Sequence, residues 1–248
     1  MANPRVAIVV PCYNEAKRLP VRRFEEFFQK SDIDFLFVDD GSRDKTKEVL
    51  HALRDQFPGK VAVIVQERNC GKAEAVRRGM SSAIERGYEF AGFWDADLAT
   101  PLGEIREFLQ LFIEQPELDM VFGSRVKLLG RHIERKAARH YLGRVFATFV
   151  STMLGLPIYD SQCGAKIFRI RSTTHTLFDR PFLSRWIFDV EILARYLSVV
   201  GTEAANSSIY EFPLHSWVDV DGSKVKPTDF FVAFRDVLRI RAAYQRKR

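Results

Sequence analysis

Residues 88–97, Tyr-Glu-Phe-Ala-Gly-Phe-Trp-Asp-Ala-Asp, join a short apolar run to two aspartates that are separated by one residue. The run is typical of a strand buried in a parallel sheet. Side chains two positions apart on an extended chain point the same way, so we expect Asp95 and Asp97 to lie together where the strand ends. Hard carboxylate oxygens suit Mg²⁺ or Mn²⁺, which commonly link proteins to nucleotide phosphates. An isolated Asp-x-Asp is usually a solvated turn, so this interpretation depends on the rest of the chain.

The first part of the chain alternates strand-like and helix-like segments. This order predicts an α/β fold with an open, mostly parallel central sheet flanked by helices. In such sheets, ligands bind beyond the carboxyl ends of the strands. Apolar runs predict strands at 5–10, 33–38, 60–65, 88–94 and 118–122, and helices are expected near 21–30, 44–57, 72–86 and 101–115.

The second part of the chain has a different pattern, with longer helical stretches. A long helix is expected over 132–154, and its apolar face, residues 141–154, would either pack in a core or dimer or lie at a membrane surface. Further segments are predicted as a strand at 165–170, a helix at 184–200, a strand near 207–212 and a last helix near 227–245.

Composition excludes several classes of protein. The 248 residues carry a net charge of +6, with basic clusters at 125–144 and at the C-terminus, which suit a phosphorylated substrate or anionic lipid. RNA-binding aromatic signatures are absent, so nucleic acid is not expected. Three scattered cysteines and no signal peptide suit the cytoplasm. The longest uncharged stretch, 145–159, is shorter than the roughly 20 residues of a membrane span, so membrane contact would be peripheral.

Polar residues also follow the other predicted strands of the first half, and they suit a nucleotide. An aromatic ring, several carboxylates and a lysine at a helix N-terminus could hold base, ribose and phosphate. The glycine fingerprint of dinucleotide-binding folds and the P-loop are both absent. The segments are Pro11-Cys12-Tyr13-Asn14-Glu15, Asp39-Asp40-Gly41-Ser42 and Asn69-Cys70-Gly71-Lys72.

With these motifs the sequence resembles the family 2 glycosyltransferases of the GT-A fold, over roughly residues 5–225. Within that family it looks most like the branch that transfers glucose and related sugars to dolichyl and other polyprenyl phosphates. The first-half motifs, with Gly123-Ser124-Arg125, are those of the broad family. The segments that point to the branch are 160–166, 185–191 and 221–224.

The resemblance implies one catalytic domain over residues 1–248, with a nucleotide-binding half at 1–124 and an acceptor-binding half at 125–248. It implies a metal-dependent hexosyltransferase that uses a nucleotide-sugar donor, expected to be UDP-glucose, with Mg²⁺ or Mn²⁺, and that inverts the linkage to a β-glycoside. A homo-oligomer is left open. The residues implied at the nucleotide-sugar site are Pro11, Tyr13, Asn14, Glu15, Asp39, Asp40, Gly71, Lys72, Asp95, Ala96 and Asp189.

The resemblance also implies the catalytic set. Asp97 would be the stronger metal ligand beside Asp95, Arg125 would approach the phosphates, and Asp160 would lie near the reacting centre. An acceptor phosphate would need cations, because two anionic groups must be brought together. We expect Arg125, Arg131, Arg135 and Arg139 to bind it, the last three on one helical face.

Three alternatives remain open from the sequence. A saccharide or small-molecule hydroxyl acceptor would require Asp160 as a general base. A polyprenyl-phosphate mannose synthase using GDP-mannose is disfavoured, since such enzymes commonly carry a Gln where this chain has Ala99. A non-catalytic nucleotide-sugar-binding protein is disfavoured by the intact aspartates with Lys72 and Asp160.

Overall fold

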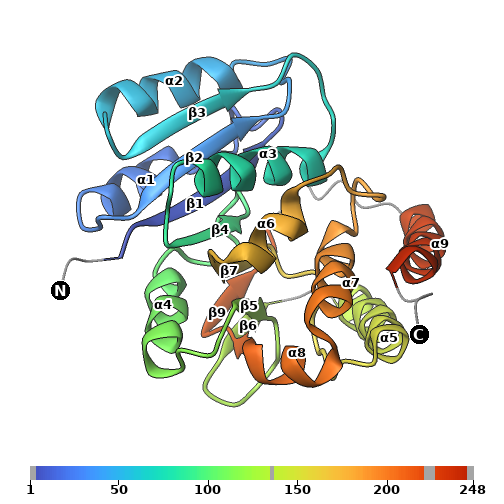
Figure 1. Ribbon diagram of the computed structural model, residues 1–248. Helices are drawn as coiled ribbons and strands as arrows, with labels where there is room; N and C mark the ends of the chain where they lie inside the picture. Colours follow the sequence, from blue (N-terminus) through green and yellow to red (C-terminus); the bar gives the residue numbers. More distant parts are fainter. Residues whose placement is uncertain (1–3, 135–136, 221–226, 245–248) are drawn as a thin grey trace. The chain divides into compact units, whose positions relative to one another are not determined.

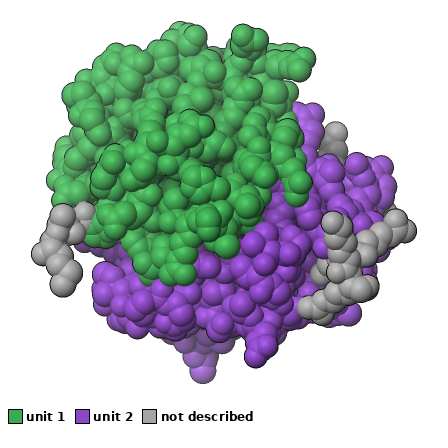
Figure 2. Space-filling view, viewed as in Figure 1, with its two compact units in different colours: residues 1–98, 165–181 green, residues 99–164, 182–248 purple. Residues whose placement is uncertain are grey.

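The computed structural model describes residues 4–134, 137–220 and 227–244, with the backbone alone for 137–140 and 227–231 (Figure 1). The chain forms two compact units (Figure 2). Unit 1 contains residues 1–98 and 165–181, and unit 2 contains residues 99–164 and 182–248. The chain therefore leaves unit 1 after residue 98, builds part of unit 2, and returns to unit 1 at residue 165. The motif at 221–224 and the tail from 245 lie outside the described residues.

Unit 1 is built on a mostly parallel sheet, as predicted. Its strands lie in the order β3-β2-β1-β4-β7. All neighbours are parallel except β7, which runs antiparallel to β4. Four of the strands confirm segments predicted in the first half. The bounds are β1 Val6–Cys12, β2 Asp34–Asp39, β3 Val61–Val65, β4 Phe90–Trp94 and β7 Ala165–Arg169.

Helices cover both faces of this sheet. Alternate side chains of each strand point to opposite faces, and in these strands both sets are largely apolar and need to be buried. On one face, Phe24 of α1 meets the rings of Phe35 and Phe37 at 5.9 and 5.2 Å between centroids. On the other face, α3 lies so close that a Cβ at Gly79 would come within 2.3 Å of Val9. The helices of unit 1 are α1 Val21–Phe28, α2 Thr46–Gln56, α3 Lys72–Glu85 and α6 Ser172–Phe178.

A glycine also allows β7 to join the sheet. Gly92 of β4 pairs with Ile167 of β7. A Cβ at Gly92 would lie only 2.1 Å from the carbonyl oxygen of Lys166, so no other residue fits there without moving the backbone. The strand that carries the Asp-x-Asp motif at its end is therefore held on both sides, by β1 and by β7.

Unit 2 contains a parallel pair, β5 with β8, and a second parallel pair, β6 with β9. Its longer helices pack on one another: Phe146 and Phe149 of α5 contact Phe234 of α9, and α7 is buried along most of its length. The elements are α4 Glu104–Glu114, β5 Met120–Ser124, β6 His132–Glu134, α5 Ala137–Leu154, α7 Phe188–Val200, α8 Thr202–Ser208, β8 Ile209–Pro213, β9 Ser216–Val218 and α9 Pro227–Tyr244.

The structure corrects two predicted helices. Residues 132–134 form strand β6 instead of starting the helix predicted over 132–154, because they pair with β9. The helix predicted from residue 184 begins at Phe188. The short elements α6, α8 and β9 were not predicted. Among the described residues, no helix is both long and apolar enough to span a bilayer.

Candidate functional site

The polar ends of β1, β2 and β4 lie at one edge of the unit 1 sheet. Cys12, at the end of β1, pairs in register with Asp39, at the end of β2, and β4 runs parallel to β1. Parallel strands bring their carboxyl ends to the same edge. Burial, with the nearby charges of Glu15 and Asp39, raises the pKa of the Cys12 thiol well above its ordinary value, so it stays protonated. The structure therefore places the predicted strand-end residues of unit 1 along one edge.

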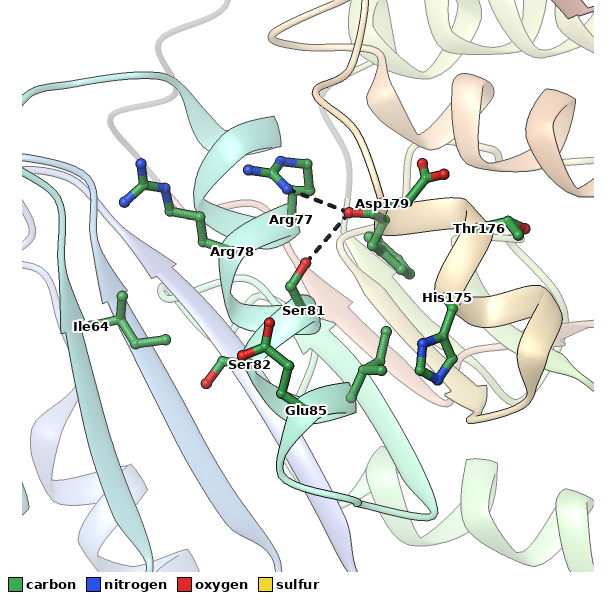
Figure 3. Close-up of a pocket in the computed structure, with 11 residues that line it drawn as sticks. Ile64, Arg77, Arg78, Ser81, Ser82, Glu85, His175, Thr176 and Asp179 are labelled. Atoms are coloured by element: carbon green, nitrogen blue, oxygen red, sulfur yellow. Dashed lines mark hydrogen bonds between the residues drawn. The ribbon is translucent and has the colours of Figure 1, made fainter.

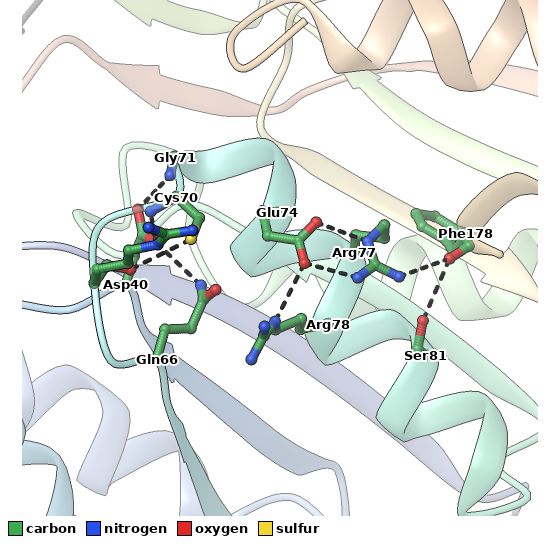
Figure 4. A network of polar contacts seen from close by, with 10 residues as sticks. Asp40, Gln66, Cys70, Gly71, Glu74, Arg77, Arg78, Ser81 and Phe178 are labelled. Carbon is green, nitrogen blue, oxygen red and sulfur yellow. Dashed lines mark hydrogen bonds and ion pairs between the residues drawn. The ribbon is translucent and has the colours of Figure 1, made fainter. Parts of the chain in front are cut away.

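Asp40 organises the loop that precedes α3 (Figure 4). Its side chain is 2% exposed. It accepts hydrogen bonds from the amides of Cys70 (2.7 Å) and Gly71 (2.8 Å) and from the side chains of Gln66 (3.1 Å) and Asn69 (2.9 Å). A buried carboxylate is stable when several donors satisfy it. Asp40 thus fixes the loop that opens α3 and leads directly into Lys72.

Gly41 lets the same two loops approach closely. Its φ of +66° lies in the left-handed region, and a Cβ there would meet the backbone carbon of Arg68 at 2.5 Å. Only glycine satisfies both conditions. The strand-end segment after β2 and the loop before α3 therefore touch through their backbones.

The loop after β1 is tied to the loop after β2 by reciprocal hydrogen bonds. The amide of Asn14 donates to Ser42 Oγ (2.9 Å), and Asn14 Oδ1 accepts from the amide of Arg43 (2.8 Å). The amide of Glu15 donates to Thr46 Oγ1 (2.8 Å). Asn14 has φ +54°, a conformation that Asn tolerates better than most residues. Pro11 lies within β1, and Tyr13 follows the end of that strand. Both residues are partly buried at this edge of the sheet.

Each carboxylate of the Asp-x-Asp motif lies near a cation. Lys72 Nζ is 2.5 Å from Asp95 Oδ1, and Arg18 Nη2 is 3.9 Å from Asp97 Oδ2. The aspartate side chains are 38% and 28% exposed, so both can be reached from solvent. Ala96 between them is buried. The two cations offset the repulsion between the paired carboxylates.

These residues fit a hard divalent cation as a partial ligand set. Two accessible carboxylates offer the oxygen donors that Mg²⁺ and Mn²⁺ prefer. Among the described residues, no group of three His, Cys, Asp or Glu side chains could hold a metal ion. Mg²⁺ usually keeps several waters and takes substrate phosphates as ligands, so a pair of aspartates is consistent with a nucleotide-bound ion. Binding through Asp95 would compete with its contact to Lys72.

In unit 2, Arg125 and Asp160 form a partly buried ion pair with two hydrogen bonds. Arg125 Nε lies 2.6 Å from Asp160 Oδ2, and Nη2 lies 2.7 Å from Oδ1. The side chains are 13% and 8% exposed. The guanidinium also lies over the ring of Trp217, at 5.2 Å from its centroid. Sequence reasoning predicted both residues but not that they bind each other.

The remaining predicted residues of unit 2 are placed as follows. Asp189 lies in the first turn of α7 and is 4% exposed. Arg131 precedes strand β6 and is therefore not on the helix of α5, so the expected helical face shared with Arg139 is wrong. Arg139 lies within α5, and Arg135 lies outside the described residues.

A hollow elsewhere in unit 1 lies between α3 and α6 (Figure 3). Its volume is about 780 Å³, and none of the predicted site residues lines it. Nearby, Arg77 binds Glu74 at 2.7 Å and donates to the carbonyl of Phe178 at 3.4 Å (Figure 4). The hydrogen bond from Arg77 lowers the pKa of the Glu74 carboxyl. This network joins α3 to α6 and supports the helix whose first residue is Lys72.

Sequence reasoning missed two residues next to the predicted ones. Arg18 contacts Asp97. Arg18 follows Glu15 by three residues, next to the polar segment after β1, and this position could have indicated that it belongs to the site. Glu211 of β8 accepts hydrogen bonds from the amides of Tyr159 and Asp160. No pattern in the sequence links positions so far apart.

The mostly parallel sheet flanked by helices is the fold of the GT-A glycosyltransferases, and solved members of that class share it. The glucosyl-3-phosphoglycerate synthase from Mycobacterium tuberculosis, in complex with Mn²⁺, UDP-glucose and phosphoglyceric acid, superposes with a TM-score of 0.69. It is 15% identical, over 97% of this chain and 79% of that one. At that identity the likeness concerns the fold.

The chain belongs to glycosyl transferase family 2, whose model matches residues 7–180. It is 32% identical over 257 residues to the dolichyl-phosphate beta-glucosyltransferase of Dictyostelium discoideum, covering 98% of this chain and 75% of that relative. It is 34% identical over 260 residues to the mouse protein of the same name, covering 97% of this chain and 76% of the relative. The predicted family and fold are confirmed.

Proposed function

We propose that this protein transfers glucose from UDP-glucose to a polyprenyl phosphate of the dolichyl type, with inversion to the β-glycoside. Relatives that match nearly the whole chain carry the name of that reaction. The structural observation that carries the proposal is the ion pair of Arg125 with Asp160, whose side chains are largely shielded from solvent. It favours an acceptor that is already anionic.

The donor would bind at the carboxyl edge of unit 1. The base and ribose are assigned to the loops after β1 and β2, with Tyr13 for stacking and Asp39 for polar contacts. Asp39 Oδ1 accepts from the amide of Ser42 at 3.1 Å, which fixes its carboxylate. Lys72, at the N-terminus of α3, would lie near the diphosphate, where lysine charge and helix amides both favour an anion.

Asp95 and Asp97 would hold Mg²⁺ or Mn²⁺ between the protein and the diphosphate. Bound there, the ion would neutralise the charge that builds on the leaving nucleoside diphosphate. Arg18 and Lys72, already beside the two aspartates, would keep the site electrically balanced when the donor is absent.

The acceptor is assigned from the Arg125–Asp160 pair. A sugar hydroxyl must lose a proton as it attacks, and so requires a general base. Both oxygens of Asp160 already accept hydrogen bonds from Arg125, so this carboxylate is arranged to hold a guanidinium in place. A phosphate acceptor is ionised near neutral pH and needs a well-oriented cation instead. The observed pair therefore supports the phosphate acceptor over a hydroxyl acceptor.

A lipid acceptor requires contact with a membrane surface, and α5 offers a suitable face. Tyr141, Leu142 and Val145 are 70%, 49% and 61% exposed on its first turns, although they are large and apolar. Further along the same apolar face, Phe146 and Phe149 pack on Phe234 of α9. A helix that leaves part of its apolar face exposed suits the boundary between lipid headgroups and acyl chains. Peripheral binding at the cytoplasmic side of a membrane is thus part of the proposal.

The test of reaction, donor and acceptor is a single transfer assay. The purified protein is incubated with radiolabelled UDP-glucose or GDP-mannose, Mg²⁺ or Mn²⁺, and a short polyprenyl phosphate, and the organic phase is counted. Label from UDP-glucose alone supports the proposal. Label from GDP-mannose alone would assign a mannose synthase, and labelled water-soluble product alone would assign a hydroxyl acceptor.

Asp97→Ala should reduce transfer by about 100-fold or more, because a metal-bound diphosphate contributes several kcal/mol to the transition state. The matched control is Asp55→Ala, an aspartate on α2 that is 66% exposed, which should leave transfer unchanged. Initial rates at saturating donor are the measurement. Full activity in Asp97→Ala would show that the metal assignment is wrong.

A further inference from the structure

We propose that Glu211 of β8 is a positioning residue for the acceptor-phosphate site. Its carboxylate fixes the backbone of Tyr159 and Asp160, and thereby the orientation of the Asp160–Arg125 ion pair. The inference rests on the proposed role of Arg125 at the acceptor phosphate and names a residue on which that role depends.

The carboxylate of Glu211 binds two consecutive backbone amides, those of Tyr159 and Asp160. Its Oε1 accepts from the amide of Asp160 at 2.6 Å, and its Oε2 accepts from the amide of Tyr159 at 2.8 Å. One carboxylate bound to two neighbouring amides sets both the position and the rotation of that backbone. The anchor itself is rigid, because β8 pairs in register with β5 through Phe122 and Glu211.

From this backbone the constraint passes to the guanidinium. Asp160 Oδ2 accepts from both the amide and the Nε of Arg125, at 3.2 and 2.6 Å, and Oδ1 accepts from its Nη2 at 2.7 Å. The amide of Gln162 also donates to Asp160 Oδ1, at 3.2 Å. The plane of the Arg125 fork therefore follows the plane of the Asp160 carboxylate, which is set by the backbone that Glu211 binds.

A second contact clamps the same segment from α5. Arg144 Nη1 donates to the carbonyl oxygen of Tyr159 at 2.8 Å, and its guanidinium carbon lies 3.5 Å from the centroid of the Tyr159 ring. The residue before Asp160 is thus held at its amide by β8 and at its carbonyl by α5. This leaves little freedom for the peptide that joins Tyr159 to Asp160.

An ionised carboxylate is energetically unfavourable at the position of Glu211. Burial raises the pKa of the Glu211 carboxyl, and the nearby charge of Asp160 acts in the same direction. The two amides and the hydroxyl of Ser124 oppose that shift. A neutral glutamine could accept only one of the two amide hydrogens, since its other group is a donor. The presence of a partly buried second carboxylate beside Asp160 is explained if accurate orientation of the ion pair is required.

The experiment compares Glu211→Gln and Glu211→Ala with the matched control Asp119→Asn. Asp119 is a carboxylate of the same unit that accepts from the hydroxyl of Tyr196 at 2.6 Å, but it precedes β5, whereas Arg125 follows β5. The first readout needs no substrate. Amide exchange at Tyr159 and Asp160, and exchange of the Arg125 Nε–H, are followed by NMR in each folded variant. Both should accelerate at least about tenfold in the Glu211 variants and stay unchanged in Asp119→Asn.

The second readout is transfer to polyprenyl phosphate. Glu211→Gln should lower kcat about 10- to 100-fold, as a misplaced group does, while the KM for UDP-glucose is unchanged. In an Asp160→Asn background, Glu211→Gln should add less than about a twofold loss, because both changes act through one pair. Multiplicative losses, or unchanged exchange at residues 159 and 160, would overturn the inference. If the unaltered protein failed to label the lipid, the proposed function would fall, and the exchange measurement would still decide the role of Glu211.

Discussion

Asp40 shows how a single side chain can serve a nucleotide site from a distance. The resemblance implies that it lines the base and ribose pocket. In the structure its two oxygens are bound by donors from the loop before α3, which leads into Lys72. We expect it to act on the donor through that loop.

Asp40→Asn should lower the free energy of unfolding by about 2–4 kcal/mol, because the amide group would face buried donors that then lack an acceptor. It should also weaken binding of UDP-glucose. Asp34→Asn is the matched control: Asp34 begins the strand that Asp39 ends, and it accepts from the hydroxyl of Tyr88 at 2.7 Å. Urea unfolding and calorimetric titration measure the two effects. Donor binding that is weakened equally in both variants would contradict the assignment.

Gly41→Ala tests the close approach of the two strand-end loops. Gly59 has a similar positive φ of +89°, but nothing lies within 4 Å of the position its Cβ would take. Gly59→Ala should therefore cost about 1–2 kcal/mol, from backbone strain alone. Gly41→Ala adds overlap with the backbone of Arg68 and should cost at least about 3 kcal/mol. Equal losses in thermal unfolding would show that the loops can separate freely.

At the scale of elements, local sequence patterns predicted the first half well. Strands such as β1 and β4 are short apolar runs with turn residues at their ends, so their period and boundaries are visible in the sequence. The position of Asp95 and Lys72 at one edge of the sheet was also expected, since each follows a predicted strand, but their direct contact was not. Direct contact of Arg125 with Asp160 was not, because residues 35 apart give no joint pattern.

Short elements of the second half depend on distant partners. The three residues of β6 are extended because they pair with β9, more than 80 positions later. Their sequence, His-Ile-Glu, is too short for a strand period to be recognised, and it stands next to a strongly helical stretch. The prediction of one helix from residue 132 was therefore wrong at its start. Tertiary pairing overrode local preference here.

The exposed face of α5 gives a prediction at this scale. Replacing Tyr141, Leu142 and Val145 together by Ser should weaken binding to anionic lipid vesicles about 10- to 100-fold, since apolar area buried in the interface is lost. Ile113→Ser on α4, a side chain that is 66% exposed, is the control and should have little effect. Co-sedimentation at fixed salt is the measurement. Unchanged binding by the triple variant would exclude this face as the membrane contact.

For the whole molecule, Glu211 should contribute a pH dependence of stability. Its pKa is raised in the folded state, mainly by burial and then by Asp160, while the amides of Tyr159 and Asp160 and the Ser124 hydroxyl oppose the rise. Two cations face the segment that Glu211 binds: Arg125 contacts Asp160, and Arg144 contacts the carbonyl of Tyr159. The stability this group contributes is present below the ordinary glutamate pKa and is lost as pH rises through the raised value.

Glu211→Gln removes that titration. Relative to the unaltered protein, the variant should therefore gain free energy of unfolding as the pH rises from the ordinary glutamate pKa through the raised pKa of Glu211 in the folded state. Urea unfolding of both proteins across this range measures the difference. A difference that stays constant with pH would mean that Glu211 does not titrate differently in the folded state.

The return of β7 to unit 1 also bears on how the nascent chain can fold. Residues 1–98 leave the ribosome long before residues 165–181, which complete the same unit. Until then β4 has an unpaired edge, and its apolar sequence lacks the partner that later lies against Gly92. Open edges of this kind pair readily with other chains. Early release of the polypeptide, before residue 165 is made, should therefore yield aggregating fragments that chaperones must hold, rather than an independently folded donor half.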